Sequence, residues 1–429
     1  MSVIPITSIN NLTSISWLQN DVLHTANWRS YVESPVPKKI QCIDDTVTAD
    51  TAFSLGSEGV ALIWTGDFQN ARQLLHAMTR RTERVQSQSK TLTRKHRKFL
   101  QHQTTFADIS PKDKFNHYRL AQSQRARTLN KLLIVLEIDY AIHLRRAPDW
   151  REACTQVYGE SNLNHSKILV SLRELLGIVS AYEWRKKGVF IPQLSQGPNR
   201  HLLKNNQLKN NQAKPPVTNV CPYYGVFAPT RQEYLELIMK ASLTSTVKLA
   251  FDIGTGTGIL AILLAQRGVP CVIATDTNVN AIQCAYENCI RLGYDDSISI
   301  VNTDMFPCLD VYGQADLIVC NPPWLPARPN SILEQAIYDS DSRMVRNFLN
   351  GLVRHLKPQG QAWLIMSNLA EHLGLRGHDE LASWIADAGL IVCDKINTYP
   401  VHSKSLNIQD GLYFARSQEM TSLWILSLA

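Results

Sequence analysis

The segment Asn321-Pro322-Pro323-Trp324 gathers hydrogen-bond acceptors and an aromatic ring at one point of the chain. Two consecutive prolines fix the backbone and remove two N–H donors, so the Asn321 side-chain oxygen and the Pro322 carbonyl are left as acceptors. A pair of acceptors suits a planar NH2 group, and holding both hydrogens aims the nitrogen lone pair outward for attack. Trp324 offers a face on which a flat substrate can stack. The structural alternative is a rigid turn that ends a strand.

A second segment, Asp252 to Gly258 (DIGTGTG), joins a strand pattern to a helix pattern. Its glycines permit a tight turn and let a ligand lie against bare backbone. The next strand pattern ends at Asp276, 24 residues after Asp252, where a carboxylate can accept both hydroxyls of a ribose. The third ends at Asp304, placed to accept an adenine amino group, with Met305 against the ring. Each aspartate alone could be a helix cap or a turn residue, but three at successive strand ends favour a nucleoside cofactor.

The glycine spacing distinguishes two kinds of cofactor. The pyrophosphate of a dinucleotide favours G-x-G-x-x-G, with a helix N-terminus aimed at negative charge. Here the spacing is G-x-G-x-G and Asp252 opens the loop, which would repel a pyrophosphate but suits a cofactor with an ammonium and a sulfonium group. A sulfonium is a good leaving group, so transfer of its methyl to a nitrogen held at Asn321 depends on placement. Neither a metal ion nor a covalent nucleophile is expected.

Regular alternation of strand and helix patterns positions these segments. Strand patterns cover 247–253, 271–276, 297–302, 315–321, 361–367, 390–399 and 422–428. Helix patterns cover 231–242, 259–268, 280–293, 342–356 and 378–389. Alternation implies parallel strands with helices on both faces, and the two adjacent closing strands imply an antiparallel last strand at the edge. We therefore predict an α/β, seven-stranded, Rossmann-like domain over 220–429.

The first half of the chain has no such regularity. Residues 1–185 are predicted to form a mixed, mostly helical domain, with a strand at 59–66, helices at 68–81 and 166–184, and an ambiguous apolar segment at 129–144. In the connecting region, 186–219, a strand at 188–194 precedes a polar stretch predicted to be a flexible loop. The similar run at 225–230 indicates that the two form a hairpin.

Composition and charge limit the class of protein. No apolar run approaches the ~20 residues of a membrane helix, the first residues lack a secretory pattern, and the nine cysteines include no C-x-x-C pair. A reduced, cytoplasmic setting without a metal or membrane is expected. Residues 1–215 carry 30 Lys/Arg against 17 Asp/Glu, while 216–429 carry 14 against 20. The excess centres on 72–146 and is densest at 80–98, which is either a solvated helix or a surface for a phosphate backbone.

The motif VCNPPW (319–324) resembles the [DN]-P-P-[FYW] signature of amino-group methyltransferases. These include N6-adenine and N2-guanine methyltransferases and the glutamine methyltransferases of release factors and ribosomal proteins. The resemblance covers about residues 220–429 and implies a class I, Rossmann-like methyltransferase that uses S-adenosylmethionine. The implied catalytic residues are Asn321, Pro322 and Trp324. The implied cofactor residues are Asp252, Gly254, Thr255, Gly256, Gly258, Asp276, Asp304, Met305 and Asn321.

Two further segments resemble the glutamine enzymes. YDSDSRMVRNFL (338–349) is similar to their G-x-D-G-x-x-x-R segment, so Asp341 and Arg343, with Pro323, are expected to line the substrate mouth. As loop residues they could equally be caps. VFAPTRQEY (226–234) resembles I-P-R-P-x-T-E, but the spacing from Pro229 to Glu233 is one residue shorter and the second proline is missing.

Three functions follow from these patterns. The leading hypothesis is methylation of an exocyclic amino group on a base of ribosomal or transfer RNA, since the motif accompanies a basic N-terminal half. A base within a helix would have to be flipped out. The second is methylation of a glutamine side chain in a release factor or ribosomal protein, because an amide offers the same two donors. The third is a non-catalytic, cofactor-binding scaffold for RNA or ribosomes.

Overall fold

The computed structural model describes residues 13–96, 109–160, 166–196, 218–400, 407–408 and 410–429, with side chains of 84–96 left aside. The chain divides into two compact units, 1–182 and 183–429. The division falls within helix α5 (Leu172–Lys187). Each unit is described by itself.

The second unit is built on a seven-stranded sheet in the order β11-β10-β9-β12-β13-β15-β14. Its strands are β9 (Leu249–Ile253), β10 (Cys271–Asp276), β11 (Ile298–Asn302), β12 (Ala315–Cys320), β13 (Leu356–Ser367), β14 (Leu390–Thr398) and β15 (Thr421–Leu428). Five neighbouring strands from β11 to β13 are parallel. The last strand, β15, is antiparallel to both of its neighbours, as predicted, but it lies between β13 and β14 and not at the edge where the sequence pattern placed it.

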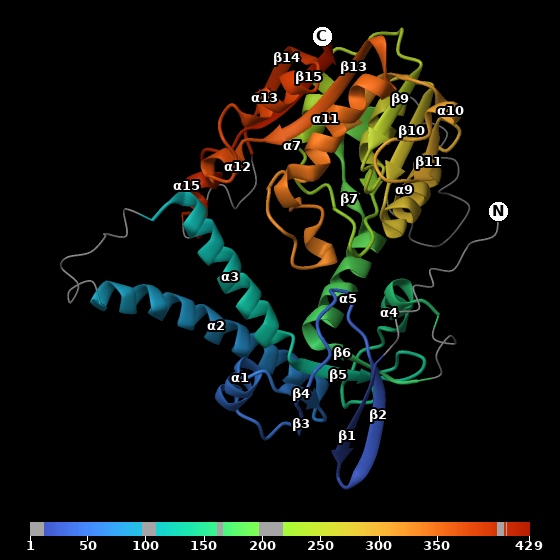
Figure 1. Ribbon diagram of the computed structural model, residues 1–429. Helices are drawn as coiled ribbons and strands as arrows, with labels where there is room; N and C mark the ends of the chain where they lie inside the picture. The colour runs from blue at the N-terminus through green and yellow to red at the C-terminus, as the bar shows by residue number, and fades with distance from the viewer. Residues whose placement is uncertain (1–12, 97–108, 161–165, 197–217, 401–406, 409) are drawn as a thin grey trace. The chain divides into compact units, whose positions relative to one another are not determined.

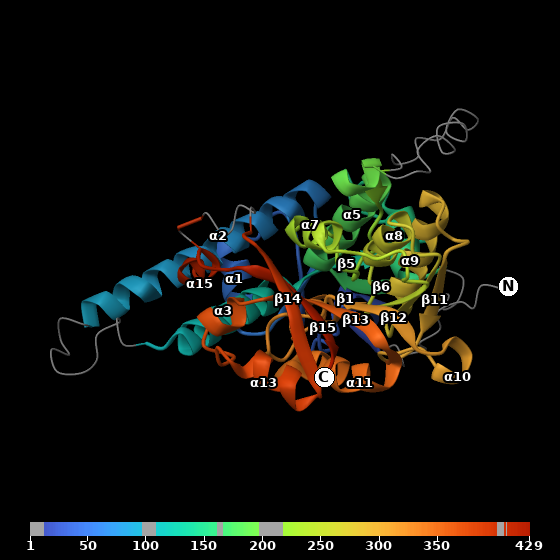
Figure 2. The same ribbon diagram turned by 90° about the horizontal axis from the view of Figure 1, so that it is seen from above.

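Helices cover both faces of this sheet, as the alternation predicts (Figure 2). The described helices of this unit are α7 (Glu233–Lys240), α8 (Ile259–Gln266), α9 (Val279–Leu292), α10 (Leu309–Tyr312), α11 (Arg343–His355), α12 (Leu369–His372), α13 (Glu380–Asp387) and α15 (Tyr413–Arg416). Helices α7 and α8 pack with β9 and β10 in one apolar core, and α11 and α13 pack in another on the opposite face. Burial of both faces explains why the central strands are apolar throughout.

The link between the units differs from the predicted hairpin. Strand β7 (Val189–Phe190) pairs antiparallel with β8 (Asn219–Val220), not with 225–230. The prediction for 225–230 was therefore wrong, and that segment carries a turn with Gly225 at φ 83°. β8 is held in place because the side-chain amide of Asn219 donates to the Lys187 carbonyl at 3.0 Å. The polar stretch at 197–217 lies outside the described residues.

The first unit contains a second sheet of six strands in the order β1-β2-β6-β5-β4-β3. They are β1 (Ser14–Gln19), β2 (Val22–Trp28), β3 (Ile40–Ile43), β4 (Ala61–Trp64), β5 (Leu132–Leu136) and β6 (Ile168–Ser171). Its helices are α1 (Ala49–Ser57), α2 (Phe68–His96), α3 (Pro111–Leu129), α4 (Arg151–Tyr158) and the start of α5 (Figure 1). More of this unit's described residues lie in helices than in strands, although the strands join in one sheet.

Two predictions for this unit need adjustment. Of the six strands, the sequence predicted β4 and left the β5 region ambiguous. The predicted helix at 166–184 begins as strand β6, whose residues are all buried, and becomes helical at Leu172. Four-residue strands that are buried on both faces have the same apolar composition as a buried helical turn, so periodicity does not separate them.

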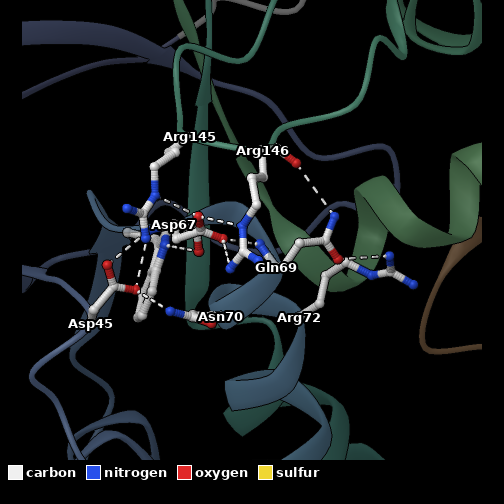
Figure 3. A network of polar contacts seen from close by, with 8 residues as sticks. Asp45, Asp67, Gln69, Asn70, Arg72, Arg145 and Arg146 are labelled. Carbon is white, nitrogen blue, oxygen red and sulfur yellow. Dashed lines mark hydrogen bonds and ion pairs between the residues drawn. The ribbon is translucent and has the colours of Figure 1, made fainter.

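A buried carboxylate anchors the loop that precedes α4 (Figure 3). The side chain of Asp67 is 0% exposed, whereas those of Arg145 and Arg146 are 76% and 58% exposed. Both arginines donate from Nε to Asp67 at 2.8 Å, and Arg146 donates a second bond from Nη2 at 2.9 Å. Asp67 also accepts the Gln69 backbone N–H at 2.9 Å, so it caps the start of α2. The arginine bonds hold the pKa of Asp67 well below its usual range.

The basic segment at 80–98 lies on α2 as far as His96. Of its described side chains, Arg81 forms an ion pair with Asp50 at 2.5 Å. The phosphate-binding surface thus stays a prediction. Among the described residues, no helix is both long and apolar enough to cross a bilayer.

Candidate active site

The strand register brings the predicted residues to one edge of the second unit's sheet. Ile253, the last residue of β9, lies between Thr275 of β10 and Cys320 of β12. The next residues along the three strands are Gly254, Asp276, which ends β10, and Asn321, so all three lie at the same edge of the sheet. In open α/β sheets, ligands bind at the carboxyl ends of the strands where the strand order reverses. In this sheet the order reverses at β9, between β10 and β12.

Each glycine of the loop meets a different local requirement. Gly254, Gly256 and Gly258 have φ values of 72°, 55° and 82°, which side chains with a Cβ rarely adopt. A Cβ on Gly258 would lie 3.2 Å from the Ala285 Cα, so this glycine lets the loop approach helix α9. A Cβ on Gly256 would meet no described atom within 4 Å. The space beside Gly256 is therefore where a ligand could approach the backbone.

Asp252 is fully buried at the start of the loop. One carboxylate oxygen accepts from the Thr255 hydroxyl at 2.6 Å and from the Ala261 backbone N–H at 3.1 Å, which ties the loop to α8. The other oxygen, Oδ1, is buried and has no hydrogen-bond partner among the described residues. Burial raises the pKa of Asp252 to about 6. An unpartnered buried acceptor of this kind fits a cationic ligand group.

Asp276 holds the loop from the next strand. Its Oδ2 accepts the Gly256 N–H at 3.0 Å, and its Oδ1 accepts the Asn278 N–H at 2.9 Å at the start of α9. Burial raises the pKa of Asp276. A carboxylate has about four lone-pair sites, so Asp276 can still accept from a ribose hydroxyl.

The segment after β11 carries the last two predicted cofactor residues. Asp304 is exposed and makes no hydrogen bond with the described part of the chain. Met305 adopts the left-handed conformation, with φ 67°. Its carbonyl accepts from the Thr275 hydroxyl at 2.6 Å, which fixes the loop to β10. The Met305 side chain is half-buried against the core below α11.

In residues 321–324, called the transfer motif below, a hydrogen bond joins Asn321 and Trp324. The Trp324 indole N–H donates to the Asn321 side-chain oxygen at 3.1 Å. An amide oxygen has two lone pairs, so one remains for a substrate. Pro322 is buried, while Asn321, Pro323 and Trp324 are half-buried. One face of the Trp324 ring is covered by the Arg231 guanidinium, whose carbon lies 4.8 Å from the ring centroid.

The structure places Asp341 and Arg343 at the start of α11, where both are exposed. Asp341 and Ser342 have φ values of 56° and 52°, so the backbone turns sharply there. Asp339, which the sequence did not single out, is half-buried and accepts the Met344 N–H at 2.6 Å. The Asp339 backbone N–H also donates to the Leu325 carbonyl at 3.0 Å, and this connects α11 to the transfer motif.

Sequence reasoning also missed Arg231 and its partners. The resemblance of 226–234 to a family segment pointed to this stretch, but nothing there indicated which side chain reaches Trp324. Among the described residues, no group of three or more His, Cys, Asp or Glu side chains could hold a metal ion.

The fold and the site together define a Rossmann-like methyltransferase domain. Counted along the chain, the first five strands of the sheet follow the Rossmann order 3-2-1-4-5, and the glycine loop and residues 321–324 follow the ends of the adjacent strands β9 and β12. Residues 218–376 match the family model described as "Methyltransferase small domain". The chain belongs to this family of S-adenosylmethionine-dependent methyltransferases.

The proteins to which the chain is similar include an adenine-N6 methyltransferase and glutamine methyltransferases. The chain is 30% identical over 129 residues to a tRNA1(Val) (adenine(37)-N6)-methyltransferase of Cytophaga hutchinsonii, covering 29% of this chain and 54% of that protein. It is 30% identical over 139 residues to a putative protein N5-glutamine methyltransferase of Methanocaldococcus jannaschii (31% and 68%). It is 30% identical over 141 residues to a release factor glutamine methyltransferase of Cereibacter sphaeroides (30% and 50%).

The chain thus spans about half to two thirds of these relatives' length. Among solved structures, a ribosomal protein L11 methylase of Lactobacillus delbrueckii subsp. bulgaricus matches with a TM-score of 0.31 and 21% identity, over 46% of this chain and 77% of that chain.

Proposed function

We propose that the chain is an N-methyltransferase that acts on the exocyclic amino group of an RNA base. The observation that carries this proposal is the register of β10, β9 and β12, which brings Asp276, Gly254 and Asn321 to the same edge of the sheet. A ligand on the glycine loop would lie next to a nitrogen held at Asn321. Transfer between two groups placed in this way depends on their alignment.

The cofactor in this proposal is S-adenosylmethionine. The buried, unpartnered Oδ1 of Asp252 and the open space beside Gly256 fit its cationic groups and its close approach to the backbone. Asp276 and Asp304 would accept from its ribose and adenine, with Met305 against the ring. When bound, the cofactor supplies an electrophilic methyl group on a sulfonium.

The residues of the transfer motif orient the acceptor nitrogen. The free lone pair of the Asn321 oxygen and the Pro322 carbonyl would accept the two hydrogens of an NH2 group, which turns its lone pair toward the methyl donor. Pro323, Asp341 and Arg343 are proposed to border the substrate. A flat base is proposed to stack on the part of the half-buried Trp324 ring that remains accessible.

RNA is favoured as substrate by the charge of the first half, where 30 Lys/Arg stand against 17 Asp/Glu in residues 1–215. A backbone of phosphates would bind such a surface with release of counterions. The similarity to a tRNA adenine-N6 enzyme points in the same direction. A cytoplasmic location is part of the proposal and accords with nine free cysteines.

The second candidate is methylation of a glutamine side chain in a translation protein, in which the first half would recognise that protein. It is favoured by the similarity to two glutamine methyltransferases. A primary amide presents the same two hydrogens as an aminopurine, so the motif accommodates either.

Methyl-labelled cofactor distinguishes the two. The full chain is incubated with labelled S-adenosylmethionine and with total RNA or total protein from the same cells. The proposal predicts label in RNA, sensitive to nuclease, with a rate that falls steeply as salt is raised. Label that appears in protein alone and survives nuclease would contradict it and support the glutamine substrate.

A further inference from the structure

Trp324 makes two specific contacts with other side chains of the chain. Its indole N–H donates to the Asn321 side-chain oxygen at 3.1 Å. The Arg231 guanidinium covers one face of the ring, with its carbon 4.8 Å from the centroid, within the range of a cation–π contact. Besides offering a ring for stacking, Trp324 is hydrogen-bonded to the side chain that would hold the nitrogen receiving the methyl group.

Two buried carboxylates fix the plane of Arg231. Its Nε donates to Glu233 at 2.9 Å and its Nη2 to Glu419 at 3.0 Å. The carboxylate side chains are 4% and 1% exposed, whereas that of Arg231 is 22% exposed. Bonds from two different nitrogens of a planar group leave it little freedom to rotate.

Glu419 is in turn attached to the end of a sheet strand. The oxygen that accepts from Arg231 also accepts from the Ser367 hydroxyl at 2.8 Å. That hydroxyl accepts the Leu369 backbone N–H at 3.0 Å. Ser367 ends β13 and pairs with Thr421, the first residue of β15. A continuous set of contacts thus runs from the sheet through Glu419 and Arg231 to Trp324 and Asn321.

We propose that Arg231 is a positioning residue for methyl transfer, which holds Trp324 so that its indole N–H selects one orientation of the Asn321 side-chain amide. This inference rests on the proposed function and adds a residue outside the transfer motif. Rotation of the Asn321 amide by half a turn would place its NH2 against the indole N–H, with a donor facing a donor. The Trp324 contact therefore keeps the amide oxygen, and not the nitrogen, at the bonded position.

The orientation of the amide matters because the nitrogen that receives the methyl group carries hydrogens, and these hydrogens bind only to hydrogen-bond acceptors. An Asn321 amide that sampled both orientations would present its own NH2 to the substrate for part of the time. A displacement of the reacting atoms by about 1 Å can lower the rate of the chemical step by about a hundredfold. The cofactor loop has no part in these contacts, so cofactor affinity should not depend on Arg231.

The test uses the full chain with Arg231→Lys, which keeps a positive charge between the two buried glutamates but removes the planar guanidinium. We expect kcat to fall by about ten- to a hundredfold, with the KM for RNA and the Kd for S-adenosylmethionine unchanged. In ¹⁵N spectra of the protein labelled at tryptophan, the Trp324 indole N–H signal, assigned with Trp324→Phe, should shift and broaden.

Arg267→Lys is the matched control. The Arg267 guanidinium carbon lies 5.6 Å from the centroid of Trp363, in the same unit. It is not bonded to the transfer motif, so the control should leave kcat and the Trp324 signal as in the native chain.

The outcomes separate the inference from the proposed function. An Arg231→Lys protein with native kcat, or with an unmoved Trp324 signal, would overturn the inference. A loss of cofactor affinity in step with kcat would also overturn it, since that indicates general damage. If the native chain methylates no RNA, the proposed function fails, while the tryptophan signal still decides whether Arg231 holds the Trp324–Asn321 pair.

Discussion

Cofactor affinity should depend on pH through Asp252. Burial raises the pKa of this carboxyl to about 6, so its ionised fraction falls about tenfold between pH 7 and pH 5. A cofactor with an ammonium and a sulfonium group binds the ionised form better. We therefore expect the Kd for S-adenosylmethionine to rise about tenfold over this interval, as measured by isothermal titration calorimetry with the full chain.

The control is Asp252→Asn, which can still accept from Thr255 and Ala261 but carries no charge. It should bind the cofactor more weakly at pH 7, with a much smaller change between pH 7 and pH 5. Asp276, whose pKa is also raised by burial, accounts for the remaining slope. A native Kd that is constant over this interval, or an equal slope in Asp252→Asn, would refute the reasoning.

The same carboxyl has the opposite effect on the stability of the protein without cofactor. The pKa of Asp252 is about 6 when folded, against 3.8 for the ordinary group. The folded chain therefore binds this proton more tightly than the unfolded chain. The Asp252 contribution to the free energy of unfolding should rise as pH falls from about 6 to about 4 and should be lost above pH 6.

Two further predictions concern residues with distinct local roles. Gly256→Ala should weaken cofactor binding and should lower stability by about 1–2 kcal/mol, because the backbone at this residue is left-handed. Gly258→Ala, whose Cβ would lie 3.2 Å from Ala285, should lower the unfolding temperature further. Calorimetry and titration check both variants, and equal effects at the two sites would contradict the assignment. Asp67→Asn should lower the unfolding temperature, because two arginines lose their shared buried carboxylate, while cofactor affinity stays native; an unchanged melting curve would show that the network does not stabilise the unit.

Most of the second unit's fold could be predicted from the sequence, because its strands are apolar, alternate with amphipathic helices and end in polar or glycine residues. Strand β10 was predicted with its observed limits. The row of Gly254, Asp276 and Asn321 follows from the same pattern, since residues after neighbouring parallel strands share one edge of the sheet.

The rest depends on contacts between distant residues. Arg231 and Glu419 are 188 positions apart, and Arg231 and Trp324 meet only in the folded chain. The pairing of β7 with 219–220 was missed because the similar run at 225–230 is a better strand pattern than the two-residue β8. In the first unit, short buried strands such as β6 lack the alternation that identifies a strand.

The most direct test of the central claim identifies the methylated product. RNA incubated with S-adenosylmethionine and either the native chain or Asn321→Ala is digested to nucleosides and analysed by mass spectrometry. We predict a methyl group on an exocyclic amino nitrogen of a base with the native chain and its loss with Asn321→Ala. Methylation of a ring nitrogen or a ribose, or a product that persists with Asn321→Ala, would contradict the account.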